Sequence, residues 1–581
     1  MIDTKKEQER AELFSSIWSV ADDLRGSVDG WDFKAYVICT MFYRFLSEKL
    51  ENEIDRVQKD YEESERRNAS GKEEPDIPAH DSTSPEKKST KDSEEDDHIY
   101  RNISDSELTP EHIAHLTNQH GYFIKPSELF CNVLKEARGV VDEKHEAQKK
   151  NSEASSPSLL DAVKGRAEEV NTKLANVFRH IEDSAKGTAS EANFKGLFSD
   201  FDVRSPKLGN TADERIKKIV AVLEKVGEMK LNGAENTIDL FGDAYEYLLK
   251  MYASNAGKSG GEFFTPQEVS ELLARLTTQE QRNVNKIYDP ACGSGSLLLK
   301  AYRAARAASD ADVDVYGQEI NLTTYNMCRI NMILHGVSYD KCDIALGDTL
   351  IQPKHWDYEP FDVIVSNPPY SIKWEGDKNP TLINDQRFAP AGVLAPKGNA
   401  DLAFVMHALS WLSNKGAAAI VCFPGVFYRG GAEQKIRRHL VEQNNVDAVI
   451  ALPDNLFFGT SIATNVLVLK KNKKDNRVLF VDATREFVKV TKNNKLTEEN
   501  IAKIADVVKN RRDIEYFSRV VPFGEIEKNK FNLTPSTYVE KPDTREKIDI
   551  VALNAELKRI VAREEELRRQ IDLIVADLES V

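Results

Sequence analysis

The spacing of hydrophobic residues changes twice along this chain of 581 residues. In residues 1–235, apolar side chains recur every three or four positions, as in WDFKAYVICTMFYRFLSEKLE and IKKIVAVLEKV, which predicts amphipathic helices. Two polar stretches, near residues 59–97 and 144–158, hold too few apolar residues to form a core, so we expect them to be disordered. The pattern therefore predicts a helical N-terminal domain with two disordered inserts.

From about residue 260, short β-branched runs alternate with amphipathic helical stretches. The runs are NKIYDP, DVDVYGQEI, FDVIVSNPPY, GAAAIVCFPG, VDAVIAL and NVLVLKK. This alternation is typical of βαβ units around a mostly parallel sheet, whose ligands bind at the carboxyl ends of the strands. We assign residues 236–480 to this α/β domain and residues 481–546 to a connecting region.

Residues 547–581 show a third pattern, in which apolar residues recur at alternating steps of four and three, broken only at Glu564. The stripe consists of Leu553, Leu557, Ile560, Leu567, Ile571, Ile574 and Leu578. A helix with this stripe could pack on its own domain. The regular period favours an intermolecular coiled coil.

Net charge, cysteine spacing and the length of apolar runs limit the kinds of protein that this chain can be. The net charge of −16 would repel phosphates at long range, so a role on nucleic acid requires a local basic patch or a partner. The 6 cysteines form no CxxC pair, and we expect neither a metal site nor a disulfide framework. No apolar run approaches the roughly 18 residues that span a bilayer, and the N-terminus lacks a signal-peptide core. We therefore expect a cytoplasmic protein with no membrane segment.

The first candidate ligand loop is DPACGSGS, which joins a predicted strand to a predicted helix. Gly293 and Gly295 allow a tight turn, and the amides near Ser296 can bind an anion or a carboxylate. A dinucleotide fingerprint would need a glycine at Leu298, which weakens a nicotinamide interpretation. Glu319 ends the next strand, where an acidic side chain can accept hydrogen bonds from ribose hydroxyls, although it could also be a surface glutamate.

A second candidate loop, GKSGGEFFTPQEV, lies upstream. Thr265, Pro266 and Glu268 fit a capping box with proline at the first helical position, which would fix the start of a helix. Phe263 and Phe264 would then lie in the loop before the helix. They could flank a flat adenine ring or belong to the core.

The third loop, SNPPY, follows an apolar run that reads as a buried strand. Pro368 and Pro369 fix φ, so the chain leaves the strand in one defined conformation. The side-chain oxygen of Asn367 and the carbonyl of Pro368 can accept the two hydrogens of a planar amino group, while Tyr370 can stack on its plane. These contacts would free the nitrogen lone pair to attack a methyl sulfonium bound at the glycine loop.

An amino group that belongs to a base in duplex DNA must first be flipped out of the helix. Flipping costs a few kcal/mol, which stacking on Tyr370 and on a second aromatic ring can offset. Phe457 or Phe458 in NLFFGTSIATN could be that second ring, and both could equally be core residues.

These motifs resemble a known family. DPACGSGS followed by NPPY, with GEFFTPQ ahead of both, resembles amino-group methyltransferases that use S-adenosylmethionine, in the γ order of DNA N6-adenine enzymes. The segments LRGSVDGWDFKAYV, IDLFGDAYEYLL, PTLINDQRFAPAGVLAP and FYRGGAEQKIR resemble the modification subunit of type I restriction-modification systems, closest to the IC branch. The resemblance covers nearly the whole chain except the polar inserts. It implies a Rossmann-like S-adenosylmethionine-dependent methyltransferase domain, a helical N-terminal domain and a C-terminal coiled-coil helix.

The resemblance also implies roles for single residues. The implied cofactor contacts are Glu262, Phe263, Phe264, Thr265, Pro266, Gln267, Asp289, Gly293, Ser294, Gly295, Ser296, Glu319 and Asp348. The implied catalytic motif is Asn367, Pro368, Pro369 and Tyr370. The implied reaction is site-specific methylation of adenine N6 in duplex DNA. The implied partners are a specificity subunit, which reads the target and joins two copies of the modification subunit, and a restriction subunit, of which two copies join that complex.

Two alternatives remain open. A protein glutamine N5-methyltransferase would present the same planar amide to an NPPY motif, although such enzymes are much smaller and lack a long helical tail. A catalytically idle scaffold could keep the fold and bind partners through its ends, but the intact NPPY and glycine loops argue against it. Cytosine C5 methylation needs a cysteine beside proline, and the sequence contains no Pro-Cys pair.

Overall fold

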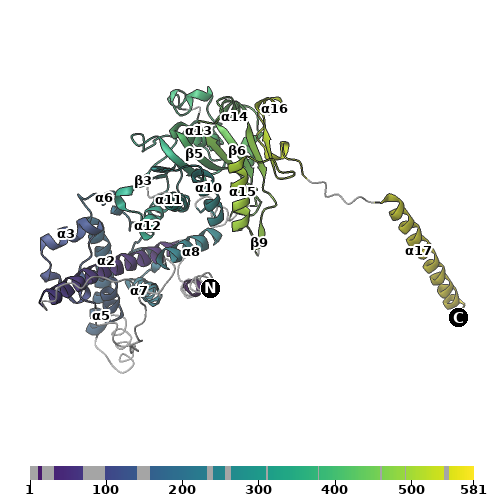
Figure 1. Ribbon diagram of the computed structural model, residues 1–581. Helices are drawn as coiled ribbons and strands as arrows, with labels where there is room; N and C mark the ends of the chain where they lie inside the picture. Colours follow the sequence, from purple (N-terminus) through teal and green to yellow (C-terminus); the bar gives the residue numbers. More distant parts are fainter. Residues whose placement is uncertain are drawn as a thin grey trace. The chain divides into compact units, whose positions relative to one another are not determined.

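The computed structural model shows an N-terminal helical part, a central α/β part and a C-terminal helix (Figure 1). The residues that it describes are 11–15, 17, 32–69, 98–139, 157–229, 231, 240–255, 264–308, 312–376, 379–457, 461–490, 493–541 and 549–580. Residues 1–539 form one compact unit, and residues 540–581 form a second. None of the described helices is both long enough and apolar enough to cross a membrane.

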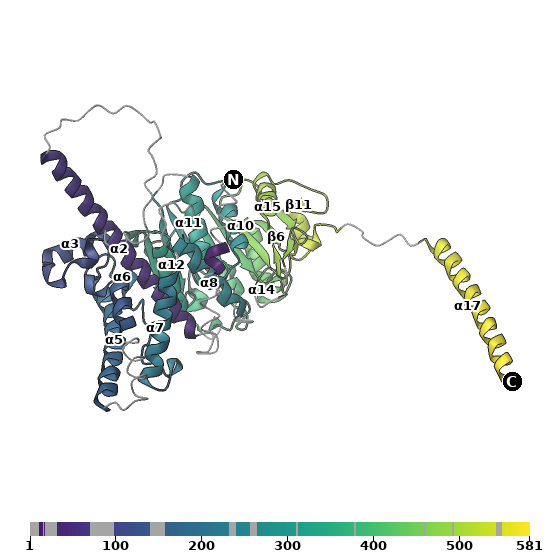
Figure 2. The same ribbon diagram turned by 90° about the horizontal axis from the view of Figure 1, so that it is seen from below.

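The helical part is built around one long helix, α2, which Figure 2 shows crossing α7. Its principal helices are α2 (Asp32–Ala69), α3 (Pro110–His120), α5 (Pro157–Ser184), α6 (Glu191–Phe194), α7 (Ala212–Glu228) and α8 (Leu240–Asn255). The buried Phe42, Tyr43 and Leu46 lie on the inner side of α2. Buried Arg44 donates to the carbonyls of Val226 and Met229, at 2.6 and 2.7 Å, where α7 ends. This cation satisfies the free carbonyls at a helix C-terminus.

The first polar insert is partly helical. α2 continues to Ala69, so the prediction of disorder is wrong for residues 59–69. Lysine, glutamate, glutamine and arginine have high helix propensity, and bonds between residues four apart support the exposed turns without a core. One such bond joins Tyr61 to Glu65 at 2.9 Å. Residues 70–97 and 144–156 lie outside the described residues, and α5 already includes residues 157–158.

The chain returns to α2 directly after the first insert. Oδ1 of Asp55 accepts from the amide of Tyr100 at 2.8 Å, and its Oδ2 lies 2.8 Å from Nδ1 of His98. Arg101 pairs with Glu51 at 2.5 Å. Glu51, Asp55 and His98 lie close enough together to hold a metal ion, but these bonds already engage all three. The contacts fix the return point of the insert on α2.

The α/β part contains a 9-stranded sheet in the order β11-β8-β6-β7-β5-β4-β1-β2-β3. Its strands are β1 (Lys286–Asp289), β2 (Asp314–Glu319), β3 (Cys342–Leu346), β4 (Phe361–Ser366), β5 (Leu412–Cys422), β6 (Val446–Ala451), β7 (Asn465–Lys470), β8 (Val478–Asp482) and β11 (Ser518–Val521). β7 pairs antiparallel with β5 and β6, and β11 pairs antiparallel with β8. The other pairs are parallel. The prediction of a mostly parallel α/β domain is confirmed.

Helices cover both faces of this sheet (Figure 1). α10 (Gln267–Thr278), α11 (Ser296–Ala308), α12 (Leu322–Leu334) and α15 (Glu498–Asn510) share one apolar core with it. α13 (Asp401–Trp411) and α14 (Ala432–Glu442) share the other. In β4, Val363 and Val365 enter the first core and Ile364 the second, as the two-residue period of a strand requires. Side chains buried on both faces explain why β4 reads as a continuous apolar run.

The division of the chain at residues 235 and 236 stays a prediction, because the two parts share a core. α8 follows that point, yet Tyr245 and Leu248 of α8 pack in the helical cluster, which also includes Ile330 of α12. The hydroxyl of Tyr245 donates to the carbonyl of Met327 at 2.7 Å. Buried Arg329 donates to the carbonyls of residues 192, 193 and 195. The helical part therefore packs directly against α12.

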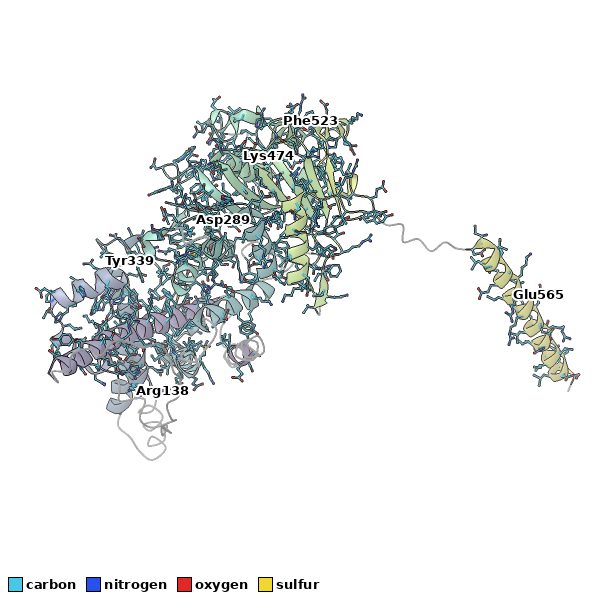
Figure 3. All side chains as sticks on the ribbon, in the orientation of Figure 1. Arg138, Asp289, Tyr339, Lys474, Phe523 and Glu565 are labelled. Atoms are coloured by element: carbon cyan, nitrogen blue, oxygen red, sulfur yellow. The ribbon has the colours of Figure 1, made fainter. Side chains whose placement is uncertain are left out.

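The C-terminal region contains the predicted helix, α17 (Ile550–Glu579). Asp549 caps it by accepting from the amides of Val551 and Ala552. The apolar stripe is 47–73% exposed, and Figure 3 shows side chains around the whole of this helix, including the labelled Glu565. A helix of this length spans about 45 Å. The coiled-coil pairing stays a prediction.

Candidate active site

The glycine loop and the Asn-Pro-Pro-Tyr corner leave neighbouring strands at the same edge of the sheet. β1 and β4 are parallel neighbours, with Ile287 opposite Val363 and Tyr288 opposite Ile364. β2 flanks β1 on its other side, also in parallel. Because parallel strands end at one edge, the loops that follow β1, β2 and β4 open side by side.

Backbone geometry fixes the glycine loop. Gly293 and Gly295 have positive φ values of 54° and 82°. A Cβ at Gly295 would lie 2.7 Å from both Sγ of Cys328 and Cε of Met332, so the turn packs too closely on α12 for any larger residue. The carbonyl of Ser294 accepts from the Asn331 side chain at 3.0 Å. The loop is thereby held against α12.

Glu319 joins the glycine loop to the end of β2. Its Oε2 accepts from the amide of Gly293 at 3.0 Å, and its Oε1 accepts from the amide of Asn321 at 2.8 Å. Burial raises the pKa of Glu319 above its usual value. Two backbone amides orient this carboxylate, so it is not the surface glutamate that the sequence left open.

Asp289 has one unsatisfied oxygen in a fully buried position. Its Oδ1 accepts from the amide of Ala291 at 2.9 Å, whereas its Oδ2 makes no hydrogen bond of good geometry with the described residues. The Ser366 side chain lies close enough to lower the pKa of this carboxyl, against the larger effect of burial. Burial raises the pKa of Asp289 to about 7. Figure 3 shows Asp289 surrounded by other side chains in the α/β part. An unpaired buried acceptor is costly unless a ligand satisfies it, and a cationic ligand group would suit it best.

A cavity of about 540 Å³ opens beside these residues. Its lining includes Glu319, Ile320, Asp348, Leu350, Pro369 and Trp374. Oδ1 of Asp348 accepts from the amide of Leu350 at 2.9 Å. Apolar walls with carboxylates at the ends of β2 and β3 suit a flat heterocycle joined to a sugar.

The loop after β3 is supported by Arg387, a residue that the sequence analysis did not single out. Arg387 is 1% exposed and donates to the carbonyls of Thr349 and Leu350, each at 2.8 Å. It also pairs with Asp385 at 2.8 Å. The segment around it has no helical or strand period, so its burial could not be read from the pattern of residues.

Asn367 is 6% exposed and is held from two sides. Its Nδ2 donates to Oγ1 of Thr265 at 3.1 Å, and its Oδ1 accepts from the hydroxyl of Tyr370 at 2.6 Å. The capping-box interpretation of Thr265 is therefore wrong, because Pro266 is the N-cap of α10 and no side chain caps this helix. The Thr265 hydroxyl contacts the Asn367 amide instead.

Tyr370 lies edge-on to Phe457, with ring centroids 6.5 Å apart and planes at 80°. Phe457 is buried in the core, so it supports the edge of Tyr370 and does not form a parallel second ring. Phe458 lies outside the described residues. Burial raises the pKa of Tyr370, which keeps its hydroxyl protonated as a donor.

Asp401, also missed from the sequence, holds the chain directly after Tyr370. Its Oδ2 accepts from the amide of Ser371 at 3.0 Å, and Ser371 has a positive φ of 52°. Asp401 is 4% exposed and begins α13, whose N-terminal dipole favours a carboxylate. A single aspartate at a helix start carries no sequence signal of this contact.

The remaining predicted positions divide into four groups. Ser294 and Ser296 are buried in the glycine loop, with their hydroxyl oxygens 3.4 Å apart. Phe264 packs in the helical core, which was one of its two expected roles. Pro266 and Gln267 line a second cavity, where Gln267 donates to Glu246 at 2.7 Å. Glu262 and Phe263 lie outside the described residues.

Two family descriptions match this chain. N-6 DNA Methylase matches residues 236–547, and HsdM N-terminal domain matches residues 13–165. The first of these ranges includes the glycine loop, the cavity and Asn367.

Curated relatives and a solved structure agree with that match. The chain is 43% identical to the type I restriction enzyme MpnII methylase subunit of Mycoplasma pneumoniae, over 99% of this chain and 98% of that protein. It is 36% identical to the MjaVII methylase subunit of Methanocaldococcus jannaschii over 61% of each chain. A crystal structure of the type I restriction-modification methyltransferase subunit from Streptococcus thermophilus superposes with a TM-score of 0.72 at 32% identity, over 91% of this chain and 100% of that one.

Proposed function

This chain belongs to the N-6 DNA methylase family as a type I restriction enzyme methylase subunit, and we propose that the Asn367–Tyr370 corner is where it methylates adenine N6. The enzyme is an S-adenosylmethionine-dependent DNA N6-adenine methyltransferase. One observation supports the residue assignment above all. The glycine loop and the Asn-Pro-Pro-Tyr corner follow β1 and β4, which are parallel neighbours.

The residues beside the cavity fit the cofactor. S-adenosylmethionine, when bound, supplies a methyl group carried on a positively charged sulfur. Oδ2 of Asp289, buried and unpaired, is an acceptor for a cationic amino group. Glu319 and Asp348 provide carboxylate oxygens for sugar hydroxyls and a ring amino group, between the apolar side chains of Ile320 and Leu350.

The corner at Asn367 fits a planar amino group. Thr265 engages the Nδ2 end of the Asn367 amide, so Oδ1 is the end that can accept from a substrate. Oδ1 accepts from the Tyr370 hydroxyl, and an amide oxygen of this kind can accept more than one hydrogen bond. With the Pro368 carbonyl as a second acceptor, the two amino hydrogens are held and the nitrogen lone pair is released from conjugation with the ring.

Tyr370 supplies the stacking surface. Base–aromatic stacking contributes about 1–3 kcal/mol per base, enough to offset much of the cost of flipping. The edge contact with Phe457 holds the plane of this ring. Asp401 fixes the backbone that follows it.

We also propose that this subunit works in a larger assembly. Its relatives are named as subunits of type I restriction enzymes, and α17 exposes an apolar stripe. These observations support a complex of two copies of this chain with one specificity subunit, to which two restriction subunits can be added. The DNA substrate supports a cytoplasmic location.

Transfer of a labelled methyl group tests the proposal. The chain, purified with its specificity subunit, should move tritiated methyl from S-adenosylmethionine to adenine in duplex DNA. The control is DNA already methylated at the target, which should accept no label. Label on a protein glutamine would instead support the N5-methyltransferase alternative, and an absence of all transfer would support the idle scaffold.

A further inference from the structure

A two-stranded hairpin lies beside the active site and is not part of the nine-stranded sheet. β9 (Val488–Val490) pairs antiparallel with β10 (Asn493–Lys495). All residues of β9 are exposed. Figure 1 shows β9 beyond the end of the sheet, below α15. The hairpin therefore presents its outer strand to solvent.

The hairpin is basic although the chain as a whole is acidic. The segment FVKVTKNNKLT, residues 487–497, has three lysines and no acidic residue, within a chain of net charge −16. Lys489 and Lys495 are both exposed. Glu486, the acidic residue just before the segment, already accepts from Lys503 at 2.6 Å and from Asn500 at 3.1 Å. Glu486 therefore pairs with α15 and not with the hairpin, whereas Glu268 lies near enough to interact electrostatically with Lys495.

The hairpin is anchored to the loop that supports the stacking ring. The amide of Asn494 donates to the carbonyl of Asn455 at 3.0 Å. Its side chain donates to the carbonyl and to Oδ1 of Asp454, each at 2.9 Å. Two residues after Asn455, Phe457 contacts the edge of Tyr370. The basic segment is thus bonded to the loop that contains Phe457, the residue that supports the Tyr370 ring.

Apolar side chains accompany the lysines. Phe487, Val488 and Val490 are 36–48% exposed. The inner side of the hairpin, from Asn493 to Lys495, borders a cavity of about 590 Å³ that Phe264 and Pro266 also line. Exposed apolar residues interleaved with lysines indicate a surface that is covered in the working complex.

We propose that Lys489 and Lys495 bind phosphates of the duplex next to the flipped adenine. This inference rests on the proposed function. If a base is flipped into the site at Asn367, the phosphates on either side of that nucleotide lie at the surface around the site. In the strand register, Lys489 lies opposite Asn494 and Lys495 opposite Val488, so the lysines lie on opposite faces of the hairpin. They can therefore reach phosphates on both sides of it. This local basic contact is what an otherwise acidic subunit requires to hold DNA.

The salt dependence of DNA binding tests the inference. The double variant Lys489→Ala/Lys495→Ala, assembled with its specificity subunit, should bind duplex DNA roughly tenfold more weakly at physiological salt. The slope of log affinity against log salt should fall by about two, because each lost phosphate contact removes nearly one unit. The KM for DNA should rise, while the Kd for S-adenosylmethionine should stay unchanged.

A matched control removes two exposed lysines elsewhere, Lys415→Ala/Lys509→Ala. Lys415 lies near the amino end of β5, and Lys509 lies in the last turn of α15. This control should leave the slope unchanged. The inference is overturned if the hairpin variant keeps the parental slope and affinity, or if it dissociates from the specificity subunit, which would make the hairpin a protein contact. A parental complex that methylates no DNA would instead refute the proposed function itself.

Discussion

At the scale of single residues, Asp289 would set the charge that the proposed cofactor site prefers. One of its oxygens is satisfied by the amide of Ala291, and the other is buried and makes no hydrogen bond of good geometry with the described residues. A raised pKa in the folded state means that the folded chain binds more protons than the unfolded chain between the two pKa values. Stability therefore falls as pH rises through that window.

The variant Asp289→Asn should show this effect directly. The pKa of Asp289 is about 7 when folded and 3.8 in its ordinary environment, so only the parent loses stability across that range. Without cofactor, the Tm of the variant minus that of the parent should grow from pH 4 to pH 7 and then stay constant, as measured by differential scanning fluorimetry. A difference independent of pH would contradict the assignment.

The same variant, Asp289→Asn, should also bind the cofactor more weakly. Calorimetry should show roughly tenfold or greater loss of S-adenosylmethionine affinity, because a charge-assisted hydrogen bond is lost.

Tyr370 combines two effects that substitution can separate. Tyr370→Phe keeps the ring but loses the hydroxyl that donates to Asn367, so kcat should fall by about fivefold, the value of one net hydrogen bond. Tyr370→Ala also loses the stacking surface and should reduce the rate by roughly a further tenfold or more. Equal rates for the two variants would show that the ring contributes nothing to catalysis.

At the scale of elements, most of the buried strands were predictable, and the side chains that hold the loops after them were not. β1, β2, β4, β5, β6 and β7 appear in the sequence as apolar runs because the sheet is covered on both faces. β3 and β11 form the two edges of the sheet and carry exposed or half-buried residues, so neither shows such a run. The buried strand β8 was not among the predicted runs. The contacts of Thr265, Arg387 and Asp401 join segments far apart in the chain, and local patterns carry no information on them.

Substitutions in α17 test the prediction that its apolar stripe forms an intermolecular coiled coil. Leu557→Glu/Leu567→Glu puts charges into the apolar stripe of α17, so it should disrupt assembly with the specificity subunit in size-exclusion chromatography. The Tm of the isolated chain should stay unchanged, since no residue of α17 is buried. Ala555→Glu/Ala562→Glu adds the same charge on the opposite side of the helix and should assemble normally. Assembly by both variants would refute the coiled-coil role.

At the scale of the whole molecule, the helical and α/β parts share a core across α12. An apolar period does not tell which core a helix joins, and the sequence analysis placed the residues of α8 with the α/β domain. α8 packs with the helical part, and α12 contacts α8, α2 and both the β2 and β3 strands. The glycine loop packs on this same α12, so the proposed cofactor site depends on both parts of the chain.

The whole account depends on Asn367 acting on the substrate and not on the cofactor. The most direct measurement is the single-turnover rate of methyl transfer to adenine by the complex carrying Asn367→Ala, with the Kd for S-adenosylmethionine measured on the same preparation. The account predicts that the rate falls by about 100-fold or more while the Kd stays within a few-fold of the parent. A rate close to that of the parent, or a loss of cofactor binding as large as the loss of rate, would contradict it.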